Sequence, residues 1–516
     1  MDSSEILKFC LKNGLLVDKE VLNLFSEIND IESVKLIINK FKQTNQKVLT
    51  KNIILGNKEE VKKIFFDLPE ANQKSLENFK IKLGLSIEIS KNIIKKEVQD
   101  EKEFEDIKVI SKSPPIGKKL EVGDFVKYFR ARLNFMKGIL QEHSELTNLV
   151  SINKISGNKQ AISIIGLVLN KRVTKNKNII FEIEDLTGKI KVLINQNKKE
   201  LYEKAEEVAL DSVIGIKGNG NKEILFANQI VFPDAVLPER KKSNKEEYAL
   251  FIGDLHFGSK LFLKESFLKF IDYLNGKVPY TPEVQKIKYL FIVGDLVTGV
   301  GNYPGQENDL EIKDLEEQFA GLASLLGKIR RDIKIIICPG NHDGVRLMEP
   351  QPVFDEKYAW PLYNLKNLIL VENPARVNIG INKDFSGFNV LMYHGFSFPY
   401  YANNITKLML KRAMNSPEDI MKYLLKNRHL APTHSSSQYF PYEDDALLIK
   451  KIPDIFVAAH THKSGVTYQN NILLISTSCW EAMTPYQEKF GNTPDHCKVP
   501  MFNLKTREIK ILDFEK

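Results

Sequence analysis

Acidic and histidine side chains follow short apolar runs at five places in the C-terminal half of the chain. In the first of these places, residues 251–259, Asp254 and His256 form the pattern Asp-x-His directly after Gly253. In an extended backbone, side chains two residues apart lie on one face, so we expect this carboxylate and imidazole to converge. A mixed oxygen and nitrogen pair of this kind suits a divalent metal. A single Asp-x-His also arises by chance, so the other four places decide the interpretation.

The other four apolar runs end in Gly-Asp, Gly-Asn-His-Asp, His-Gly and His-x-His. The polar residues concerned are Asp295, Asn341, His342, Asp343, His394, His460 and His462. Buried strands of an open sheet present the side chains at their carboxyl ends to a common crevice. One histidine at a strand end is more often structural than a ligand, but five such ends in series indicate a single metal site.

The chain that must position these residues has 516 residues, of which 43% are hydrophobic and 27% are charged. This composition is typical of a globular protein with two to four domains. The net charge of +8 is compatible with a polyanionic partner and equally with a lysine-rich protein. The four cysteines form no Cys-x-x-Cys pair, which argues against a disulfide framework and a zinc ribbon. No signal peptide or membrane-spanning run is recognisable, so we expect a cytoplasmic protein that does not bind membranes.

The first part of the chain is expected to contain helices and a linker. Apolar residues at helical spacing predict a helical module over residues 1–95. Residues 96–121 carry mixed charges and a Pro-Pro pair, and this predicts a charged linker. Residues 122–157 begin with a helix that Asp124 is expected to cap, and the basic residues of that helix are expected to face solvent.

Two domains are expected after this helix. Residues 158–236 show three strands, a helix and two more strands, which is the order of an OB-fold. Such barrels bind single strands through basic and aromatic residues, but this one has few aromatics, so a packing or partner-binding role stays open. Residues 237–247 form a polar linker, and residues 248–516 alternate apolar strands with helices. The predicted fold is multidomain, with an α-helical N-terminal module, an OB-fold β-barrel and a C-terminal α/β domain.

The five motifs resemble, in this order, those of the calcineurin-like metallophosphoesterase superfamily. The resemblance covers residues 248–516 and implies a β-sandwich with flanking helices and a two-metal site at its strand ends. It implies that the first metal is held by Asp254, His256 and His462, the second by Asn341, His394 and His460, and that Asp295 bridges them. It further implies that His342 is a catalytic histidine outside the ligand set and that Asp343 orients it. Ala459 departs from the pattern, since the superfamily usually has Gly before His-x-His.

Two divalent metal ions are therefore expected as cofactors. The mixed nitrogen and oxygen ligands favour Mn²⁺, with iron, nickel, zinc or magnesium as alternatives. Two such ions clamp a phosphate and lower the pKa of a shared water.

Three further features point to one family within the superfamily. They are residues 341–352, residues 478–487 and an OB-fold directly ahead of the phosphoesterase domain. Together they look like the family of small subunits of archaeal family D DNA polymerases. This resemblance implies a 3′→5′ exonuclease that proofreads for a large catalytic polymerase subunit. The implied partners are that large subunit and DNA, at single-stranded 3′ ends or mismatched primer termini.

Two other functions stay open, a phosphoesterase for phosphoproteins or small nucleotides and a non-catalytic scaffold for the large subunit.

Four further residues also have two interpretations each. Arg346 meets a substrate phosphate or pairs with Glu349. His429 and His434 line a DNA entrance or are structural, and Trp480 packs in the core or stacks on a base.

Overall fold

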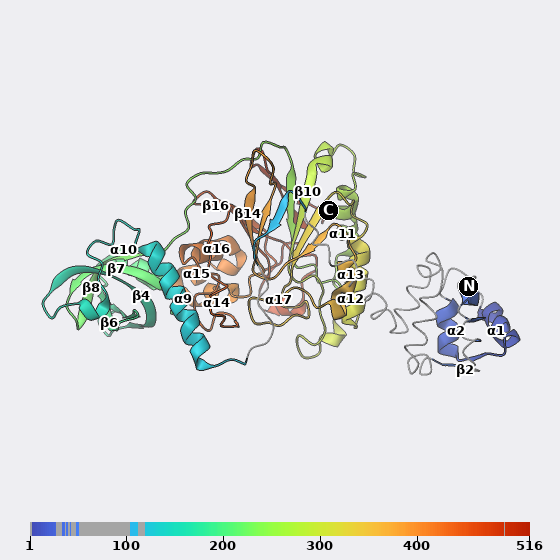
Figure 1. Cartoon of the computed structure of the whole chain (residues 1–516), viewed down its shortest axis with the longest axis horizontal. Helices are drawn as coiled ribbons and strands as arrows, with labels where there is room; N and C mark the ends of the chain where they lie inside the picture. Colours follow the sequence, from blue (N-terminus) through green and yellow to red (C-terminus); the bar gives the residue numbers. More distant parts are fainter. Residues whose placement is uncertain are drawn as a thin grey trace. The chain divides into compact units, whose positions relative to one another are not determined.

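The computed structural model describes residues 3–26, 34–36, 38–39, 42, 48–50, 104–111, 119–489 and 491–515. The chain divides into two compact units, residues 1–103 and 104–516. In the first unit the described elements are helices α1 (Ser3–Lys12) and α2 (Lys19–Ser26) and the paired strands β1 (Leu16–Val17) and β2 (Val48–Leu49) (Figure 1). Much of the helical prediction for residues 1–95 lies outside the described residues.

Helix α9 (Val122–Leu140) leads into the β-barrel. It begins with a capping box in which the Glu121 N–H donates to the Asp124 carboxylate at 3.0 Å. Asp124 therefore caps from the third helical position rather than from the N-cap. The prediction that the basic residues of this helix face solvent is wrong for Arg132, which is 1% exposed.

The barrel is closed in the order β4-β5-β6-β8-β7. Its elements are β4 (Gln160–Val173), β5 (Ile179–Glu184), β6 (Lys189–Ile194), α10 (Lys199–Glu206), β7 (Val213–Gly220) and β8 (Ile224–Val231). Alternate side chains of these strands point inward and form an aliphatic core around Phe181. The predicted OB-fold is confirmed.

Two six-stranded sheets make up the C-terminal domain. The first sheet has the order β12 (Leu368–Leu370), β11 (Lys334–Cys338), β10 (Ile287–Val293), β9 (Tyr248–Ile252), β18 (Lys498–Asn503) and β19 (Ile509–Asp513). The second has the order β16 (Gly465–Gln469), β17 (Ile472–Ser476), β15 (Ile455–Ala458), β14 (Phe388–Tyr393), β13 (Ala375–Ile379) and β3 (Ile107–Val109). Strands β9 to β12 are mutually parallel, as are β14, β15 and β17, so their carboxyl ends lie together within each sheet.

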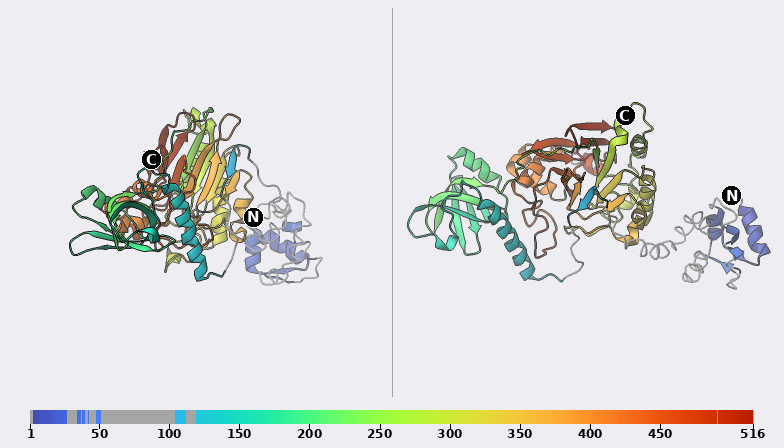
Figure 2. Two further views of the ribbon diagram at one scale, coloured as in Figure 1. Left: turned by 60° about the vertical axis from the view of Figure 1, so that its left-hand side comes forward. Right: turned by 45° about the horizontal axis from the view of Figure 1, so that its top comes forward.

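The sheets pack face to face, and helices cover both outer faces (Figures 1 and 2). The helices on the first sheet are α11 (Lys264–Leu274), α12 (Leu315–Leu326) and α13 (Glu356–Tyr363), and those on the second are α14 (Phe398–Asn404), α15 (Thr406–Leu410) and α16 (Pro417–Lys426). Short α17 (Pro485–Lys489) and the 3-10 turns Ile152–Lys154, Pro282–Lys286, Gln306–Asn308 and Ala413–Asn415 lie in connections. This arrangement confirms the predicted sandwich with flanking helices.

Strand β3 comes from the segment that the sequence predicts to be a linker. It pairs antiparallel with β13, with Val109 opposite Val377 and Ile107 opposite Ile379. The Tyr289 hydroxyl also donates to Asp106 at 2.6 Å. Three residues are enough for an edge strand. So short a run of alternating residues gives no clear strand signal between charged residues, and this is why the sequence predicts a linker here. Among the described helices, none is long and apolar enough to cross a bilayer.

Candidate metal centre

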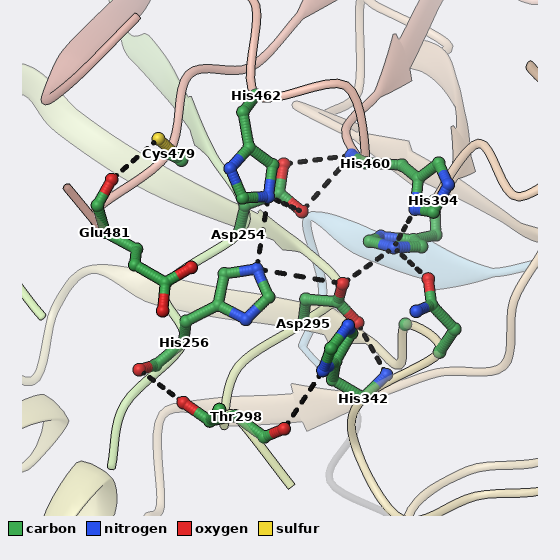
Figure 3. Close-up of polar contacts among 12 residues, drawn as sticks. Asp254, His256, Asp295, Thr298, His342, His394, His460, His462, Cys479 and Glu481 are labelled. Atoms are coloured by element: carbon green, nitrogen blue, oxygen red, sulfur yellow. Dashed lines mark hydrogen bonds and ion pairs between the residues drawn. The ribbon is translucent and has the colours of Figure 1, made fainter. Parts of the chain in front are cut away.

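The carboxyl ends of five strands, three from one sheet and two from the other, meet at one edge of the sandwich. Asp254 follows β9, Asp295 follows β10, Asn341 follows β11, His394 follows β14 and His460 follows β15. Figure 3 shows the predicted side chains pointing toward a common centre. Donor atoms within 4.8 Å of one another define three groups: Asp254, His256 and His462; His256, Asp295 and His342; and Asp295, His394 and His460. The structure therefore brings the predicted residues together.

The first group lies around a pair of facing imidazoles. Nε2 of His256 lies 3.2 Å from Nε2 of His462, and an Asp254 oxygen lies 3.8 Å from the latter nitrogen. Asp295 extends toward this group, with one carboxylate oxygen 3.9 Å from His256 Nε2.

The second group lies on the other side of the Asp295 carboxylate. The same oxygen of Asp295 lies 3.2 Å from His394 Nε2. That nitrogen is also 3.0 Å from the Asn341 amide oxygen and 3.2 Å from His460 Nδ1. Asp295 is thus the residue shared by both groups, as a bridging ligand would be.

The ring nitrogens of this centre fit bound cations. His394 Nδ1 donates to the carbonyl oxygen of Val293 at 3.0 Å, which leaves the Nε2 atom facing the centre. Burial, reinforced by the neighbouring imidazoles, lowers the pKa of His256 and of His460 to about 3, so both rings are neutral. Ring nitrogens that face each other at 3.2 Å beside carboxylates form a donor set that a divalent cation would suit.

His394 differs from the other imidazoles because of its carboxylate neighbour. Burial lowers the pKa of His394, but the Asp295 carboxylate outweighs burial and raises that pKa to about 10. The histidines likewise hold the pKa of Asp295 well below its usual range, although burial opposes this. A proton on His394 therefore competes with a cation for the same position.

The backbone at the centre is left-handed at five ligand positions. The φ angles are +50° at Asp254, +47° at His256, +49° at Asp295, +70° at His460 and +56° at His462. The prediction of an extended Asp254–His256 pair is therefore wrong, because β9 ends at Ile252 and the chain turns there. Such conformations cost non-glycine residues about 1–3 kcal/mol each and cluster at functional sites. Backbone hydrogen bonds hold these turns, from Asp254 to Gly294 and from His256 to Asp295.

Glycines next to the ligands permit the close approach of the strand ends. A β-carbon at Gly294, where φ is +77°, would lie 2.4 Å from His394 Nδ1. A β-carbon at Gly340 would lie 2.3 Å from an Asp295 oxygen. The unusual Ala459 is accommodated because its methyl group lies against Gly253, where a side chain would approach it to 2.9 Å.

His342 is oriented by the loop that follows β10. Its Nδ1 donates to the Thr298 carbonyl oxygen at 3.0 Å, and the Asn302 amide lies 3.1 Å from the same nitrogen. The His342 backbone N–H donates to Asp295 at 2.8 Å. The sequence analysis missed Thr298 and Asn302, whose only signal is their position in the loop after Gly-Asp.

Asp343 does not orient His342 as the resemblance implies. Its carboxylate accepts hydrogen bonds from the backbone N–H groups of Val297 (3.0 Å) and Gly340 (2.8 Å). Burial raises its pKa to about 7. Consecutive side chains point apart here, so Asp343 braces the two loops that carry Asp295 and Asn341.

Two side chains from residues 478–487 also reach the centre. The Gln487 amide nitrogen lies 2.8 Å from His462 Nδ1, so it fixes the rotation of that ring. The Glu481 carboxylate lies beside His256 in Figure 3 and is 6% exposed. Burial raises its pKa to about 7. The sequence signalled this stretch as a family feature without assigning these roles.

Arg346 and Glu349 do not form the ion pair that the sequence left open. The Arg346 guanidinium donates to the Pro350 carbonyl at 2.8 Å and to the Tyr442 hydroxyl at 3.0 Å. Glu349 is buried and accepts from Ser437 and Tyr393.

Of the remaining residues, one faces solvent and two are structural. His429 is 1% exposed and bonded to Asp445, so it does not line a DNA entrance. His434 is exposed, and its ring bonds to the Tyr439 hydroxyl at 2.6 Å. Trp480 is fully buried against Phe267, which confirms the core interpretation.

Comparisons with known proteins identify both domains and the family of the chain. Residues 249–464 match the calcineurin-like phosphoesterase family, and residues 162–223 match the OB-fold nucleic acid binding domain. The DNA polymerase II small subunit of Methanothermobacter thermautotrophicus is 35% identical over 76% of this chain and 80% of its own length. The chain belongs to the family of DNA polymerase II small subunits. The family members of Archaeoglobus fulgidus and Pyrococcus furiosus are 36% and 38% identical over 72% and 76% of this chain. The match spans 73% of the former relative and 63% of the latter, less than two thirds of its length.

Proposed function

We propose that this chain is the 3′→5′ exonuclease subunit of a family D DNA polymerase. It removes nucleotides from single-stranded or mismatched 3′ ends and works with a large catalytic subunit in replication. The observation that carries the proposal is the convergence of the Asp295 carboxylate with two groups of buried donors, around His256 and around His394.

The two donor groups are suited to hold two divalent ions, of which Mn²⁺ is favoured by the nitrogen and oxygen ligands. When bound, such ions supply positive charge to the phosphate and acidify a water molecule. Asp254, His256 and His462 would hold one ion, Asn341, His394 and His460 would hold the other, and Asp295 would serve both. Burial of these carboxylates and imidazoles keeps the arrangement rigid before substrate arrives.

His342 acts on the phosphodiester from the side of the centre that stays partly open. With Nδ1 tied to the Thr298 carbonyl, Nε2 is the ring nitrogen left for substrate. When His342 is protonated at both nitrogens, Nε2–H donates a hydrogen bond to the phosphate. As water adds to phosphorus and the bond between phosphorus and the 3′ oxygen breaks, Nε2 gives its proton to the leaving 3′ oxygen. Asn302 donates to the same Thr298 carbonyl at 3.0 Å and so holds the acceptor that orients the ring.

The partners follow from the family and from the domain order. Small subunits of a DNA polymerase II imply a large subunit, and an OB-fold next to a phosphoesterase domain favours DNA over phosphoproteins or small nucleotides. Every ligand position of the superfamily pattern carries a residue that can bind a metal, and this favours a hydrolytic subunit over a scaffold without activity.

The test is release of nucleotides from 3′-labelled single-stranded DNA with Mn²⁺, by the unaltered chain and by His342→Ala. We expect the variant to lose at least about 10²-fold in rate while metal affinity is retained. His143→Ala, at a histidine that pairs with Glu145 outside the centre, is the matched control and keeps full activity. Undiminished release by His342→Ala contradicts the mechanism. Turnover of a small phosphodiester without hydrolysis of DNA favours another substrate, and large-subunit binding by a metal-free, inactive chain favours a scaffold.

A further inference from the structure

One aromatic ring is exposed on the outer face of the barrel. Phe226 on β8 is 45% exposed, although large aromatic side chains normally lie in the core. Across the sheet it is paired with Leu193 on β6 and with Asn219 on β7, so its flat face is not covered by a larger side chain from these strands. An exposed ring on a strand of an OB-fold is a platform on which a nucleic-acid base stacks.

A basic hollow of about 580 Å³ lies beside the same strand. Its lining residues are Asn197, Lys198, Lys199, Glu200, Leu201, Lys204, Asn228, Gln229 and Ile230. Lys198 is anchored to β8, because its Nζ donates to the Ala227 carbonyl at 3.0 Å and to the Asn228 amide at 2.7 Å. In the described part of the chain, Lys199 and Lys204 are exposed and take part in none of the ion pairs. Among the lining residues three lysines outnumber the carboxylate Glu200, so the hollow keeps an excess of positive charge that is available to phosphates.

Lys217 extends the basic surface onto β7. It lies opposite Gln229 in the register of β7 and β8, two positions from the Asn219–Phe226 pair along β7. Amide side chains and lysines thus lie on two sides of Phe226. Lysines bind the phosphates of a nucleic-acid backbone, and amides form hydrogen bonds with the edges of its bases.

The neighbouring face of β5 and β6 has the opposite character. Glu184 on β5 pairs with Lys189 on β6 at 3.2 Å, and Glu182 lies opposite Lys191. The positive charges of that face are therefore opposed by carboxylates, and an approaching polyanion would meet both signs. Strands β5 and β6 carry Phe181 as their aromatic residue, and it is fully buried.

We propose that single-stranded DNA crosses the OB-fold over β8, with a base stacked on Phe226 and backbone phosphates at Lys199 and Lys204. The DNA strand does not cross the face of β5 and β6, because the lysines there are opposed by carboxylates. This inference rests on the proposed function only in taking DNA as the substrate, and it does not depend on hydrolysis.

The test measures binding of a labelled oligothymidylate of about 16 nucleotides to the full chain by fluorescence anisotropy, with EDTA present to prevent hydrolysis. Phe226→Ala is expected to weaken binding about 5- to 30-fold, and Phe226→Trp to restore it. The double variant Lys199→Ala/Lys204→Ala is expected to weaken binding about tenfold and to reduce the slope of log K against log salt by about 1.4. Lys189→Ala, on the opposed face, is the matched control and binds like the unaltered chain.

Equal affinity of Phe226→Ala and the unaltered chain overturns this strand path, and so does an equal loss in Lys189→Ala. Thermal unfolding of each variant verifies that the barrel is intact. If Phe226→Ala binds DNA normally but loses the large subunit, the exposed ring is a protein contact and the proposal is wrong. Hydrolysis is assayed separately. Its absence from the unaltered chain counts against the proposed nuclease alone, while a Phe226-dependent affinity in the same sample supports the strand path.

Discussion

In the part of the chain that the structure describes, two buried clusters of aspartate and histidine differ in how their polar atoms are satisfied. In the first, Asp445 accepts from Arg132 Nε and from His429 Nε2, each at 2.8 Å. His429 Nδ1 accepts from the Ala431 N–H at 2.9 Å, so both nitrogens of this ring have a partner. In the metal centre, His256 Nε2 instead faces another imidazole nitrogen at 3.2 Å.

This difference shows that burial of histidine and aspartate does not by itself indicate a metal. The Arg132–Asp445–His429 cluster carries its own cation, the guanidinium, and its hydrogen bonds are complete. Arg132 also donates to the carbonyls of Asp211 and Pro432, so the cluster ties helix α9 and the barrel to the C-terminal domain. Among the described side chains of the strand-end cluster no guanidinium is present, and a proton on His394 stands where a divalent cation would bind.

The sharpest test of the metal centre is Asp295→Asn, which removes the charge that both donor groups share. We expect hydrolysis of DNA and of a small phosphodiester to fall at least about 10³-fold, on the order of 4 kcal/mol in transition-state stabilisation. Steady-state rates at saturating Mn²⁺ provide the measurement. A rate within tenfold of the unaltered chain would show that Asp295 does not bridge.

The equivalent change in the first cluster, Asp445→Asn, should affect stability and spare the chemistry. It leaves Arg132 buried without its carboxylate, which costs about 3–5 kcal/mol. Urea unfolding followed by tryptophan fluorescence measures this loss. Burial opposes ionisation of Asp445, but His429 and Arg132 hold its pKa well below its usual range, so this stabilisation is present above about pH 4 and is lost as the pH falls. Unchanged stability at pH 7 would contradict a structural role.

Glu349 is a buried acid with hydroxyl partners and no cation, and it should respond to pH in the opposite sense. Burial raises its pKa from 4.5 to about 7, so the folded chain binds more protons than the unfolded chain between these values. Stability therefore falls as the pH rises through this window, by on the order of 3 kcal/mol. Glu349→Gln should remove the dependence. The free energy of unfolding of the unaltered chain and of Glu349→Gln is measured at pH 5 and pH 8. The same change in this free energy for both proteins would refute the prediction.

Adding Mn²⁺ should stabilise the strand-end cluster selectively. At a free concentration of about 100 times Kd, one bound ion raises the unfolding free energy by about 2.7 kcal/mol. Thermal shifts with and without Mn²⁺ show this for the unaltered chain. His256→Ala should lose most of the shift and His429→Ala should keep it. An equal shift in both variants would remove the distinction between the clusters.

The smallest effect is expected at the loop that orients His342. Asn302→Ala removes the amide that donates to the Thr298 carbonyl at 3.0 Å and holds this acceptor of the imidazole, and about a tenfold loss in kcat with unchanged metal affinity should follow. Single-turnover hydrolysis provides the readout. An unaltered rate would mean that the Thr298 carbonyl is sufficient to orient the ring.

Much of the fold and the candidate site could be predicted because the relevant signals are local. Apolar runs of strand length ending in Asp, Asn or His appear directly in the sequence, and parallel strands bring such ends to one edge. The left-handed backbone at Asp254 and the role of Asp343 could not be predicted, since neighbouring motifs do not encode where a chain turns after its strand. Thr298 and Asn302 were missed because their partner, His342, lies on another loop.

The sequence by itself determined the order of the domains, the strands of the barrel and sandwich, and the residue types available to hold cations. The tertiary structure decided which polar groups satisfy one another. By its spacing Arg132 lies among the apolar positions of helix α9, seven residues after Phe125, but a guanidinium is expected in solvent. It is buried because Asp445, more than 300 positions later, accepts a hydrogen bond from it. Strand β3 likewise exists because β13 offers an unpaired edge. These contacts depend on groups brought together from distant parts of the chain, and local spacing carries no record of them.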